Sequence, residues 1–249
     1  MPNGYNGKIL RVDLSNGTTS VDEPDEDFYR RYIGGRGFIS YFLLQELAGG
    51  EDALGPENKL VFATGALTGV PVAGSGRNSI GAKSPLTNGY GDAEVGGYWG
   101  AELKHAGYDA IIIEGKAASP VYLWIKDGKA EIRDAGHLWG KTTGECQKLI
   151  QDELGDKSIR VAQIGVAGEN QVRYACVVND INHAAGRSGM GAVMGSKNLR
   201  AVAVRGHQKV ALSDEKAVSS LAKQISDMLK DNRSAVSFHK DGTAGGLMA

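Results

Sequence analysis

The architecture can be read outward from residues 96–117, which run GGYWGAELKHAGYDAIIIEGKA. The segment 97–105 is predicted to form a short helix that ends before Gly107, because glycine is a common residue just past a helix C-terminus. The apolar segment 109–114 is then predicted to form a buried strand. The stretch therefore indicates a glycine turn, a short helix and a strand in close succession.

A second stretch has the same character. Residues 183–204 run HAAGRSGMGAVMGSKNLRAVAV, in which a glycine-rich loop over 183–195 precedes a strand predicted over 199–204. Glycine makes up 36 of the 249 residues, roughly double its average usage, yet it alternates with well-patterned apolar segments. Glycine at this density serves tight turns or brings the backbone close to a ligand.

The two halves of the chain show the same order of predicted elements. Each half begins with a β-hairpin, and the hairpin turns at Gly17 and Gly128 lie 111 residues apart. A helix, a strand, a glycine loop and a further strand follow in both halves, which we interpret as an internal duplication. The alternative is that hairpins recur by chance in a β-rich chain.

The predicted elements cover most of the chain. Strands are predicted over residues 8–14, 18–21, 59–63, 79–83, 109–114, 121–126, 130–133, 159–164, 172–178 and 199–204. Helices are predicted from residue 25, over 38–47, 97–105 and 142–154, and from an N-cap at Ser213. The helix over 142–154 begins with a capping box of Thr142 and Glu145. Its apolar face is expected to hold Cys146, Leu149, Ile150 and Leu154.

Composition excludes several classes of protein. The 28 Lys and Arg residues nearly balance the 29 Asp and Glu residues, which argues against a nucleic-acid partner. Hydrophobic residues at 41% and charged residues at 23% are typical of a soluble globular protein. No apolar run is long enough for a membrane span, and the first residues lack the pattern of a signal peptide. A cytoplasmic protein without a membrane partner is therefore expected.

The sequence offers no catalytic or metal-ligating motif of its own. Cys146 and Cys176 do not belong to a C-x-x-C pair, so this chain alone predicts neither a zinc ribbon nor an iron–sulfur cluster. Both thiols are interpreted as buried and unreactive. The five histidines show no metal-ligand spacing, and only His183, inside a glycine loop, is a candidate for a functional role.

Two glycine loops are the candidate binding elements. Arg77 lies among glycines in the first loop, over residues 65–100, and Arg187 lies among glycines in the second. Free backbone N–H groups beside a guanidinium form a suitable cradle for a phosphate or another oxyanion, and Gly96-Gly97 adds a predicted helix start. The alternative is that the loops are only turns. Neither loop has the spacing of a P-loop or a dinucleotide fingerprint, which disfavours an ordinary nucleotide-binding domain.

These segments together resemble the N-terminal domain of the tungsten-containing aldehyde:ferredoxin oxidoreductase family. The matching segments keep their order over residues 4–206: GKILRVDLSNG, GGRG, PENKLVFATGALTG, GRNSIGAKSPLT, GGYWGAELKHAGYDAIIIEGKA, IRDAGHLWGK, AQIGVAGEN and HAAGRSGMGAVMGSKNLRAVAV. The resemblance implies an α+β fold, in which a duplicated pair of mixed β-sheets with short helices forms a base for a tungstopterin cofactor. Residues 1–208 would form this pterin-cradling domain.

Residues 209–249 would be the beginning of the family's helical C-terminal part. The helix predicted from Ser213 has an apolar stripe that nothing later in the sequence can cover, so we expect the chain to be the front part of a longer protein. The alternative is that the β-rich part of the chain covers this stripe. The stripe consists of Val218, Leu221, Ile225, Met228 and Leu229.

The resemblance also implies which residues bind the cofactor. The family's cofactor-binding positions fall on Arg77, Glu94, Gly96, His183, Ala184, Gly186 and Arg187. Two of them depart from well-known members, which have Asn at the position of Glu94 and Arg at that of His183. A carboxylate repels phosphates unless it binds magnesium or only its backbone is used, and a neutral His weakens a positive cradle.

The activity implied by the resemblance is oxidation of a small aldehyde to a carboxylic acid at a tungsten bis-pyranopterin centre. Magnesium would link the pterin phosphates, and a 4Fe-4S cluster would pass electrons to ferredoxin or a similar electron carrier. The ligands of that cluster would lie outside this chain, so the chain alone is expected to show no turnover. A homo-oligomer is compatible with this interpretation. The alternative hypothesis is a non-catalytic scaffold or partner-binding domain that kept the fold and lost the cofactor.

Overall fold

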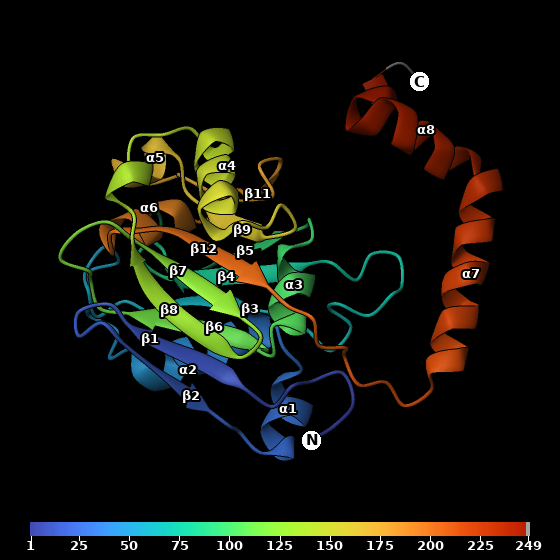
Figure 1. Ribbon diagram of the computed structural model, residues 1–249, viewed down its shortest axis with the longest axis horizontal. Coiled ribbons are helices and arrows are strands. Elements are labelled where there is room, and N and C mark those ends of the chain that lie inside the picture. The colour runs from blue at the N-terminus through green and yellow to red at the C-terminus, as the bar shows by residue number, and fades with distance from the viewer. Residues whose placement is uncertain (248–249) are drawn as a thin grey trace.

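The protein consists of two stacked β-sheets, with longer helices on their outer faces, two short helices packed into the layer between them, and an arm of helices at the C-terminal end (Figure 1). The structure is a computed structural model that describes residues 1–247. Each sheet has six strands and mixes parallel with antiparallel pairs. The predicted α+β fold with a pair of mixed sheets is therefore confirmed.

The first half of the chain forms the first sheet, in the order β2-β1-β6-β3-β4-β5. Its strands are β1 (Ile9–Asp13), β2 (Thr18–Asp22), β3 (Leu60–Ala63), β4 (Asn78–Lys83), β5 (Tyr90–Val95) and β6 (Ala110–Glu114). The helices of this half are α1 (Glu26–Tyr32), α2 (Arg36–Glu46) and α3 (Trp99–His105).

The second half forms the second sheet, in the order β11-β10-β9-β12-β7-β8. Its strands are β7 (Val121–Lys126), β8 (Lys129–Asp134), β9 (Arg160–Gln163), β10 (Val177–Asn179), β11 (His183–Ala185) and β12 (Leu199–Arg205). Its helices are the 3-10 turn η1 (Gly136–Leu138), α4 (Thr143–Leu154), α5 (Val166–Glu169) and α6 (Met190–Ser196). The arm consists of α7 (Glu215–Asp231), α8 (Arg233–Asp241) and the 3-10 helix η2 (Gly242–Leu247).

The strand order shows the internal duplication directly. Replacing each strand of the first sheet by the strand six places later in the chain gives the order of the second sheet, read from its other end. Strand directions agree as well, because β1 and β6 pair in parallel, as do β7 and β12. All other neighbours in both sheets are antiparallel. The predicted duplication is thus confirmed at the level of topology.

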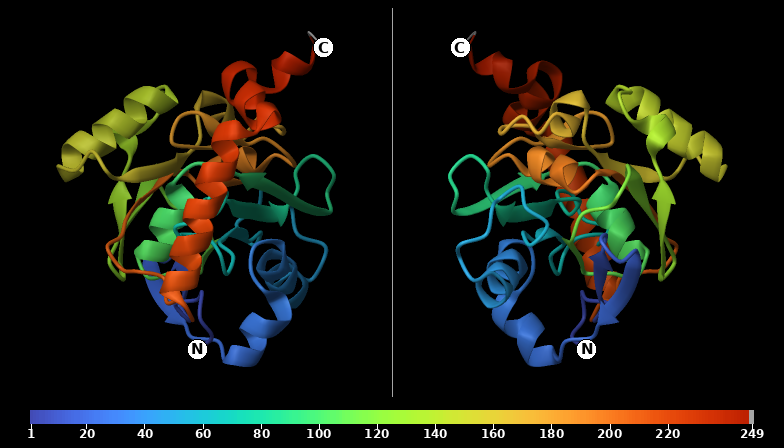
Figure 2. Two further views of the ribbon diagram at one scale, coloured as in Figure 1. Left: turned by 90° about the vertical axis from the view of Figure 1, so that its right-hand side faces the viewer. Right: turned by 90° about the vertical axis from the view of Figure 1, so that its left-hand side faces the viewer.

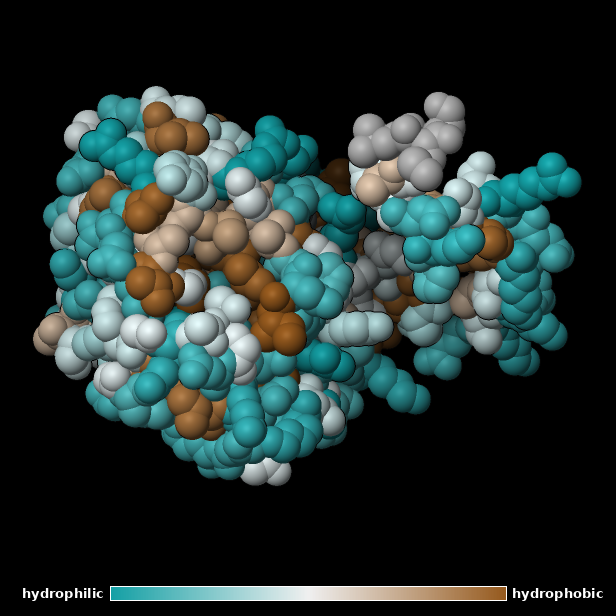
Figure 3. All heavy atoms as spheres, turned by 90° about the horizontal axis from the view of Figure 1, so that it is seen from above, coloured by the Kyte–Doolittle hydropathy of each residue, from teal (hydrophilic) through white to brown (hydrophobic). Residues whose placement is uncertain are grey.

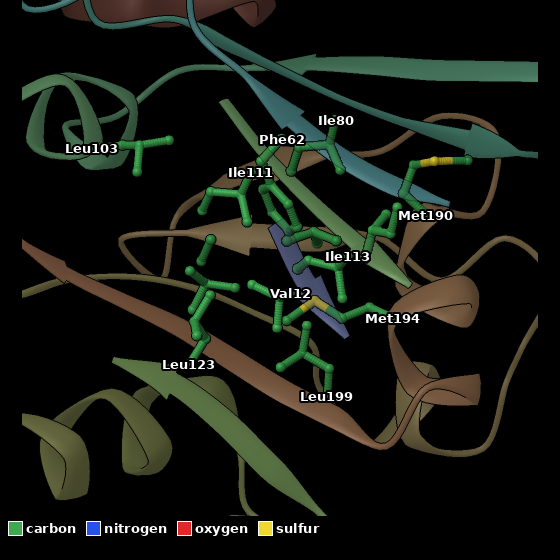
Figure 4. Packing of buried hydrophobic residues seen from close by; sticks show 14 of the residues in the cluster. Val12, Phe62, Ile80, Leu103, Ile111, Ile113, Leu123, Met190, Met194 and Leu199 are labelled. Atoms are coloured by element: carbon green, nitrogen blue, oxygen red, sulfur yellow. The ribbon is translucent and has the colours of Figure 1, made fainter. Parts of the chain in front are cut away.

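The alternation of side chains along each strand builds three apolar layers. In β6, Ile111 and Ile113 face the inner layer between the sheets, whereas Ile112 faces α1 and α2. In β7, Leu123 faces the inner layer and Trp124 faces α4. Figure 4 shows side chains of both sheets meeting in the inner layer together with Met190 and Met194 of α6. This layer holds the two halves together.

Three sequence predictions in the glycine-rich segments are wrong. Besides the strand predicted over 79–83, the first loop contains a strand that was not predicted, β5, which pairs with β4 along its full length. The strand predicted over 172–178 is limited to Val177–Asn179, and Tyr174 is 74% exposed. The second loop contains β11 and α6, and every residue of α6 is buried. Strands β5 and β11 each pair with the strand just before them in the chain, but glycine and aspartate in these segments give a weak strand signal. Helix α6 instead depends on packing against β3, β4 and β5, which lie far away in the sequence.

Local signals at helix ends agree better with the structure. Thr142 and Glu145 form the predicted capping box, with Thr142 as the N-cap of α4. Cys146 and Ile150 are buried on the inner face of that helix as predicted, whereas Leu149 is 38% exposed. The N-cap of α7 is Asp214, whose side chain accepts a hydrogen bond from the N–H of Ala217, and not Ser213.

Lys197 is a fully buried lysine at the C-terminal end of α6. Its Nζ donates to the carbonyl oxygens of Pro56, at 3.2 Å, and Gly115, at 3.1 Å. Burial, with a smaller contribution from nearby Lys59, lowers the pKa of Lys197 to about 7. Since the unfolded chain keeps this proton up to a higher pH, it binds more protons than the folded chain between about pH 7 and pH 10. The contribution of Lys197 to the stability of the fold therefore rises with pH in this window.

Lys197→Met is expected to remove this pH dependence. The free energy of unfolding of the unsubstituted protein, minus that of the variant, should increase by about 2 kcal/mol between pH 7 and pH 9. Urea unfolding of both proteins at the two pH values measures the change, and any loss of the two hydrogen bonds cancels because it does not depend on pH. A difference that stays constant or falls over this range would contradict the assignment.

Ile181 occupies a backbone conformation that β-branched residues rarely adopt. It lies in the turn between β10 and β11 with φ at +60°, directly after Asp180 at φ +49°, and its side chain is 51% exposed. A β-branched residue at such a φ is strained.

Glycine at position 181 is expected to give a more stable protein than alanine does. Ile181→Gly and Ile181→Ala delete the same side-chain contacts, but only glycine relieves the positive φ. The Gly variant should be more stable than the Ala variant by about 1 kcal/mol in chemical denaturation. The reverse order, which holds at ordinary positions, would show that residue 181 is not in the left-handed region.

Candidate functional site

A hollow of about 1240 Å³ lies at the side of the sheets that faces the C-terminal arm. One wall is the glycine loop over residues 69–77, and the floor includes the turn over 96–98 and His183. The opposite wall comes from α7 and α8, which stand beside the body in Figure 3. Figure 2 shows α7 running along one side of the body.

The turn over residues 96–98 connects β5 to α3. It leaves no room for a side chain at Gly97, or at Gly76 of the glycine loop that packs against it. Gly97 has φ +86°, and a Cβ there would lie 2.6 Å from Oδ2 of Asp180. A Cβ on Gly76 would lie 2.5 Å from the carbonyl oxygen of Gly97. The glycine loop and the turn therefore pack backbone against backbone, which explains why both need glycine.

The same turn contains two backbone N–H groups that have no acceptor among the described residues and belong to glycines lining the hollow. They are the N–H groups of Gly96 and Gly97. Consecutive free N–H groups in a glycine turn attract anions and other acceptors. We therefore take this turn, rather than the short helix α3, as the binding element.

The structure brings three of the seven predicted site residues to the hollow. Arg77, Gly96 and His183 line it. The remaining four lie on neighbouring segments: Glu94 on β5, Ala184 on β11, and Gly186 and Arg187 on the turn that follows. Strands β5 and β11 are the edge strands of the two sheets and lie side by side, so all seven residues belong to one region.

Arg77 and Arg187 are free to bind a ligand. Both are exposed, and within the described part of the chain neither forms an ion pair. The carbonyl oxygen of Arg77 accepts a hydrogen bond from Oγ1 of Thr68 at 3.0 Å, which fixes its backbone and leaves the guanidinium available. Arg77 lines the hollow together with Gly96 and Gly97, and Arg187 lies on the turn after β11. Guanidinium groups without a partner among the described residues fit an anionic ligand.

Glu94 is not an isolated negative charge. Its Oε1 accepts a hydrogen bond from Oγ of Ser79 at 3.3 Å and lies 3.7 Å from Nε of Arg36. The same Nε of Arg36 lies 2.5 Å from Oδ2 of Asp92. Arg36 lies in the GGRG segment and is the first residue of α2, and no sequence pattern predicted its contact with β5. Its positive charge reduces the repulsion that Glu94 exerts on an anion in this region.

Asn179 and Asp180 are site residues that the sequence interpretation missed. They lie at the end of β10, four and three residues before His183, and their side chains contact the turn over 96–98. Arg160 stacks on the ring of Tyr98, with its guanidinium carbon 4.7 Å from the ring centre. The only signal for these residues was the polar run NDIN over 179–182, directly before the second glycine loop.

The described part of the chain contains no other obvious reactive centre. Among residues 1–247, no group of three or more His, Cys, Asp or Glu side chains could hold a metal ion. No helix among these residues is long and apolar enough to cross a membrane. Cys146 is buried, and burial raises the pKa of its thiol to about 11, whereas Cys176 is partly exposed.

Comparison with known proteins gives consistent results. The family model "Aldehyde ferredoxin oxidoreductase, N-terminal domain" matches residues 9–206. The tungsten-containing aldehyde ferredoxin oxidoreductases of Pyrococcus abyssi and Pyrococcus horikoshii are 51% and 50% identical to this chain over 242 residues. These matches cover 97% of this chain and 40% of each relative.

A solved structure shares the fold. The active-site complex BamBC of a benzoyl coenzyme A reductase, in complex with 1,5-dienoyl-CoA, matches 92% of this chain and 35% of its own chain. The sequence identity is 39% and the TM-score is 0.88. The chain spans about two fifths of the length of the curated relatives it matches. With a family model over most of its length and relatives at half identity, this chain belongs to the aldehyde ferredoxin oxidoreductase family, whose N-terminal domain it contains.

Proposed function

We propose that this chain is the N-terminal, cofactor-cradling part of an oxidoreductase that oxidises aldehydes to carboxylic acids at a tungsten bis-pyranopterin centre. Electrons would leave through a 4Fe-4S cluster, held by another part of the protein, to ferredoxin or a similar carrier. The observation that supports this most strongly is at the hollow, where the N–H groups of Gly96 and Gly97 and the guanidinium of Arg77 have no partner among the described residues.

The residues present fit a cofactor that carries phosphates. The N–H groups of Gly96 and Gly97 would donate hydrogen bonds to phosphate oxygens, and Arg77 and Arg187 would supply positive charge. Close packing of Gly76 against Gly97 keeps this surface free of side chains. When bound, the tungstopterin supplies the two-electron chemistry, and this part of the chain binds and orients it.

Magnesium at the phosphates is part of the same proposal. The carboxylate of Glu94 is a suitable oxygen ligand for magnesium, and its contact with Arg36 is long enough, at 3.7 Å, to leave it available. We also propose a cytoplasmic protein, since its electron carrier would be soluble, and a homo-oligomer.

The aldehyde substrate is assigned from the relatives at half identity. The benzoyl coenzyme A reductase complex has the same fold at 39% identity, so an enzyme named for another substrate uses this domain as well. We infer that the domain holds the cofactor and that substrate choice depends on residues outside it.

A scaffold that has lost the cofactor is the second candidate. The observation that favours it is His183, which stands where the resemblance leads us to expect arginine, and whose buried Nδ1 has no hydrogen-bond partner in the described structure. The two candidates differ in bound metal, which can be measured directly.

The protein expressed from its complete gene under anaerobic conditions with tungstate should contain about one tungsten and four iron atoms per chain. Elemental mass spectrometry measures both metals. Iron without tungsten would point to a lost pterin site, with Glu94 and His183 as the first residues to revert. A well-folded protein with neither metal would favour the scaffold.

Arg77→Ala and Arg187→Ala should weaken retention of the cofactor. Losing one charge-assisted hydrogen bond costs about 1.5–3 kcal/mol, so each variant should lose tungsten at least tenfold faster during dialysis. Arg30→Ala is the matched control, because Arg30 is an exposed arginine on α1 that pairs only with Glu26 among the described residues. Equal retention in all three variants would contradict the role of the two loop arginines.

A further inference from the structure

The geometry points to Asp180 as a positioning residue, which holds the ligand-binding turn of the first half from the second half of the chain. Asp180 would not touch the ligand. It would fix the backbone of residues 96–98, so that the N–H groups of Gly96 and Gly97 face the hollow. The identity of the ligand rests on the proposed function, whereas the hold on the turn does not.

The carboxylate of Asp180 is bound to the backbone of the turn. Its Oδ2 accepts a hydrogen bond from the N–H of Tyr98 at 2.6 Å, between residues 82 positions apart in the sequence. Asp180 is only 8% exposed, so this hydrogen bond is shielded from competing water. The close approach of the carboxylate to Gly97, which a methyl group would block, shows that the turn and Asp180 are packed in one position.

Asn179 holds the other side of the same turn. Its Nδ2 donates to the carbonyl oxygen of Gly96 at 3.1 Å and to Oδ1 of Asn78 at 3.0 Å. Asn78 begins β4 and Asn179 ends β10, and these two strands are counterparts in the duplicated topology. Two consecutive residues of one half thus bind the carbonyl before Gly97 and the N–H after it. The backbone between these points can move little.

The turn that carries Asp180 is itself strained. Asp180 and Ile181 have φ values of +49° and +60°, and neither is glycine. Strained conformations persist where surrounding contacts enforce them, and they concentrate at functional sites. Because Ile181 is half exposed, its own packing does not enforce the strain, whereas the contacts of Asn179 and Asp180 with residues 96–98 do.

Arg160 completes the contact from the second sheet. It stacks on the ring of Tyr98, and its Nη1 lies 4.0 Å from Oδ1 of Asp180. That Oδ1 has no hydrogen bond in the described structure, so Arg160 gives it only a long ion pair. Two roles for Asp180 can therefore be separated: an acceptor at a fixed place for the N–H of Tyr98, or a negative charge for Arg160. The hydrogen bond from Tyr98 is short, at 2.6 Å, whereas the ion pair with Arg160 is long, at 4.0 Å. This difference favours the first role.

Two conservative variants distinguish these roles in the full-length protein. Asp180→Asn keeps the shape and one acceptor oxygen but removes the charge, whereas Asp180→Glu keeps the charge and moves the oxygens by one methylene group. If Asp180 positions the turn, the Asp180→Asn variant should hold the turn as firmly as the unsubstituted protein does. The Asp180→Glu variant should hold it as poorly as Asp180→Ala does. The exposed Asp152→Ala on α4, which pairs with Lys157, is the control.

Hydrogen exchange of the Tyr98 amide, followed by mass spectrometry, reports the hold on the turn without any cofactor. Exchange should be about tenfold faster in the Glu and Ala variants and nearly unchanged in the Asn variant and the control, as expected for loss of one buried hydrogen bond. The proposal would be overturned if the Tyr98 amide exchanged equally fast in all proteins. It would also be overturned if this amide exchanged fast in the Asp180→Asn variant and slowly in the Asp180→Glu variant. The Asn and Glu variants still decide the question if the Ala variant does not fold.

Tungsten retention in the same variants links the turn to the ligand. The Glu variant should lose tungsten faster than the Asn variant, in the same order as the exchange rates. If the unsubstituted protein holds no tungsten, the proposed function fails, while the exchange rates still test the hold on the turn. If tungsten is held equally by all variants despite altered exchange, Asp180 positions the turn for no ligand and the inference is wrong.

Discussion

The packing of two sheets of equal topology against one inner apolar layer determines where everything else lies. Ile111 and Ile113 from one half meet Leu123 and Leu199 from the other, and the short helices α3 and α6 fill the space between the sheets. With the sheets stacked in this way, their edge strands β5 and β11 come together on one side. The turns that follow these two strands are the glycine-rich ones, so the duplication itself places both binding loops in one region.

The site is built from backbone more than from side chains. Gly76 and Gly97 leave room for close backbone packing, and the N–H groups of the turn remain available because the second half holds its other polar atoms. Charges are added around this surface: among residues 1–247, Arg77 and Arg187 form no ion pair, while Arg36 pairs with Asp92 and lies near Glu94. A cradle of this kind suits a cofactor that performs the chemistry itself, and leaves the protein to bind and orient it.

Much of the fold follows from the sequence, because it depends on local signals. The hairpin turns at Gly17 and Gly128, the capping box at Thr142 and the buried strand β6 each have a short-range cause. Strand β5 escaped prediction because GYGDAEV has low strand propensity and depends on β4 for its conformation. Arg36 and Asp180 escaped for a related reason. Arg36 meets Asp92, 56 residues away, because α2 packs against β4 and β5. Asp180 meets Tyr98, 82 residues away, because the two halves of the chain stack against each other.

Each sheet is completed within its own half of the chain, and this affects synthesis of the protein. Strand β1 must wait for β6, but every partner in the first sheet has left the ribosome once residue 114 emerges. The inner face of that sheet then remains uncovered until the second half has been made, because its apolar side chains pack against β7 and β12. A nascent chain of this length therefore exposes a broad apolar surface, which chaperones would need to shield during translation.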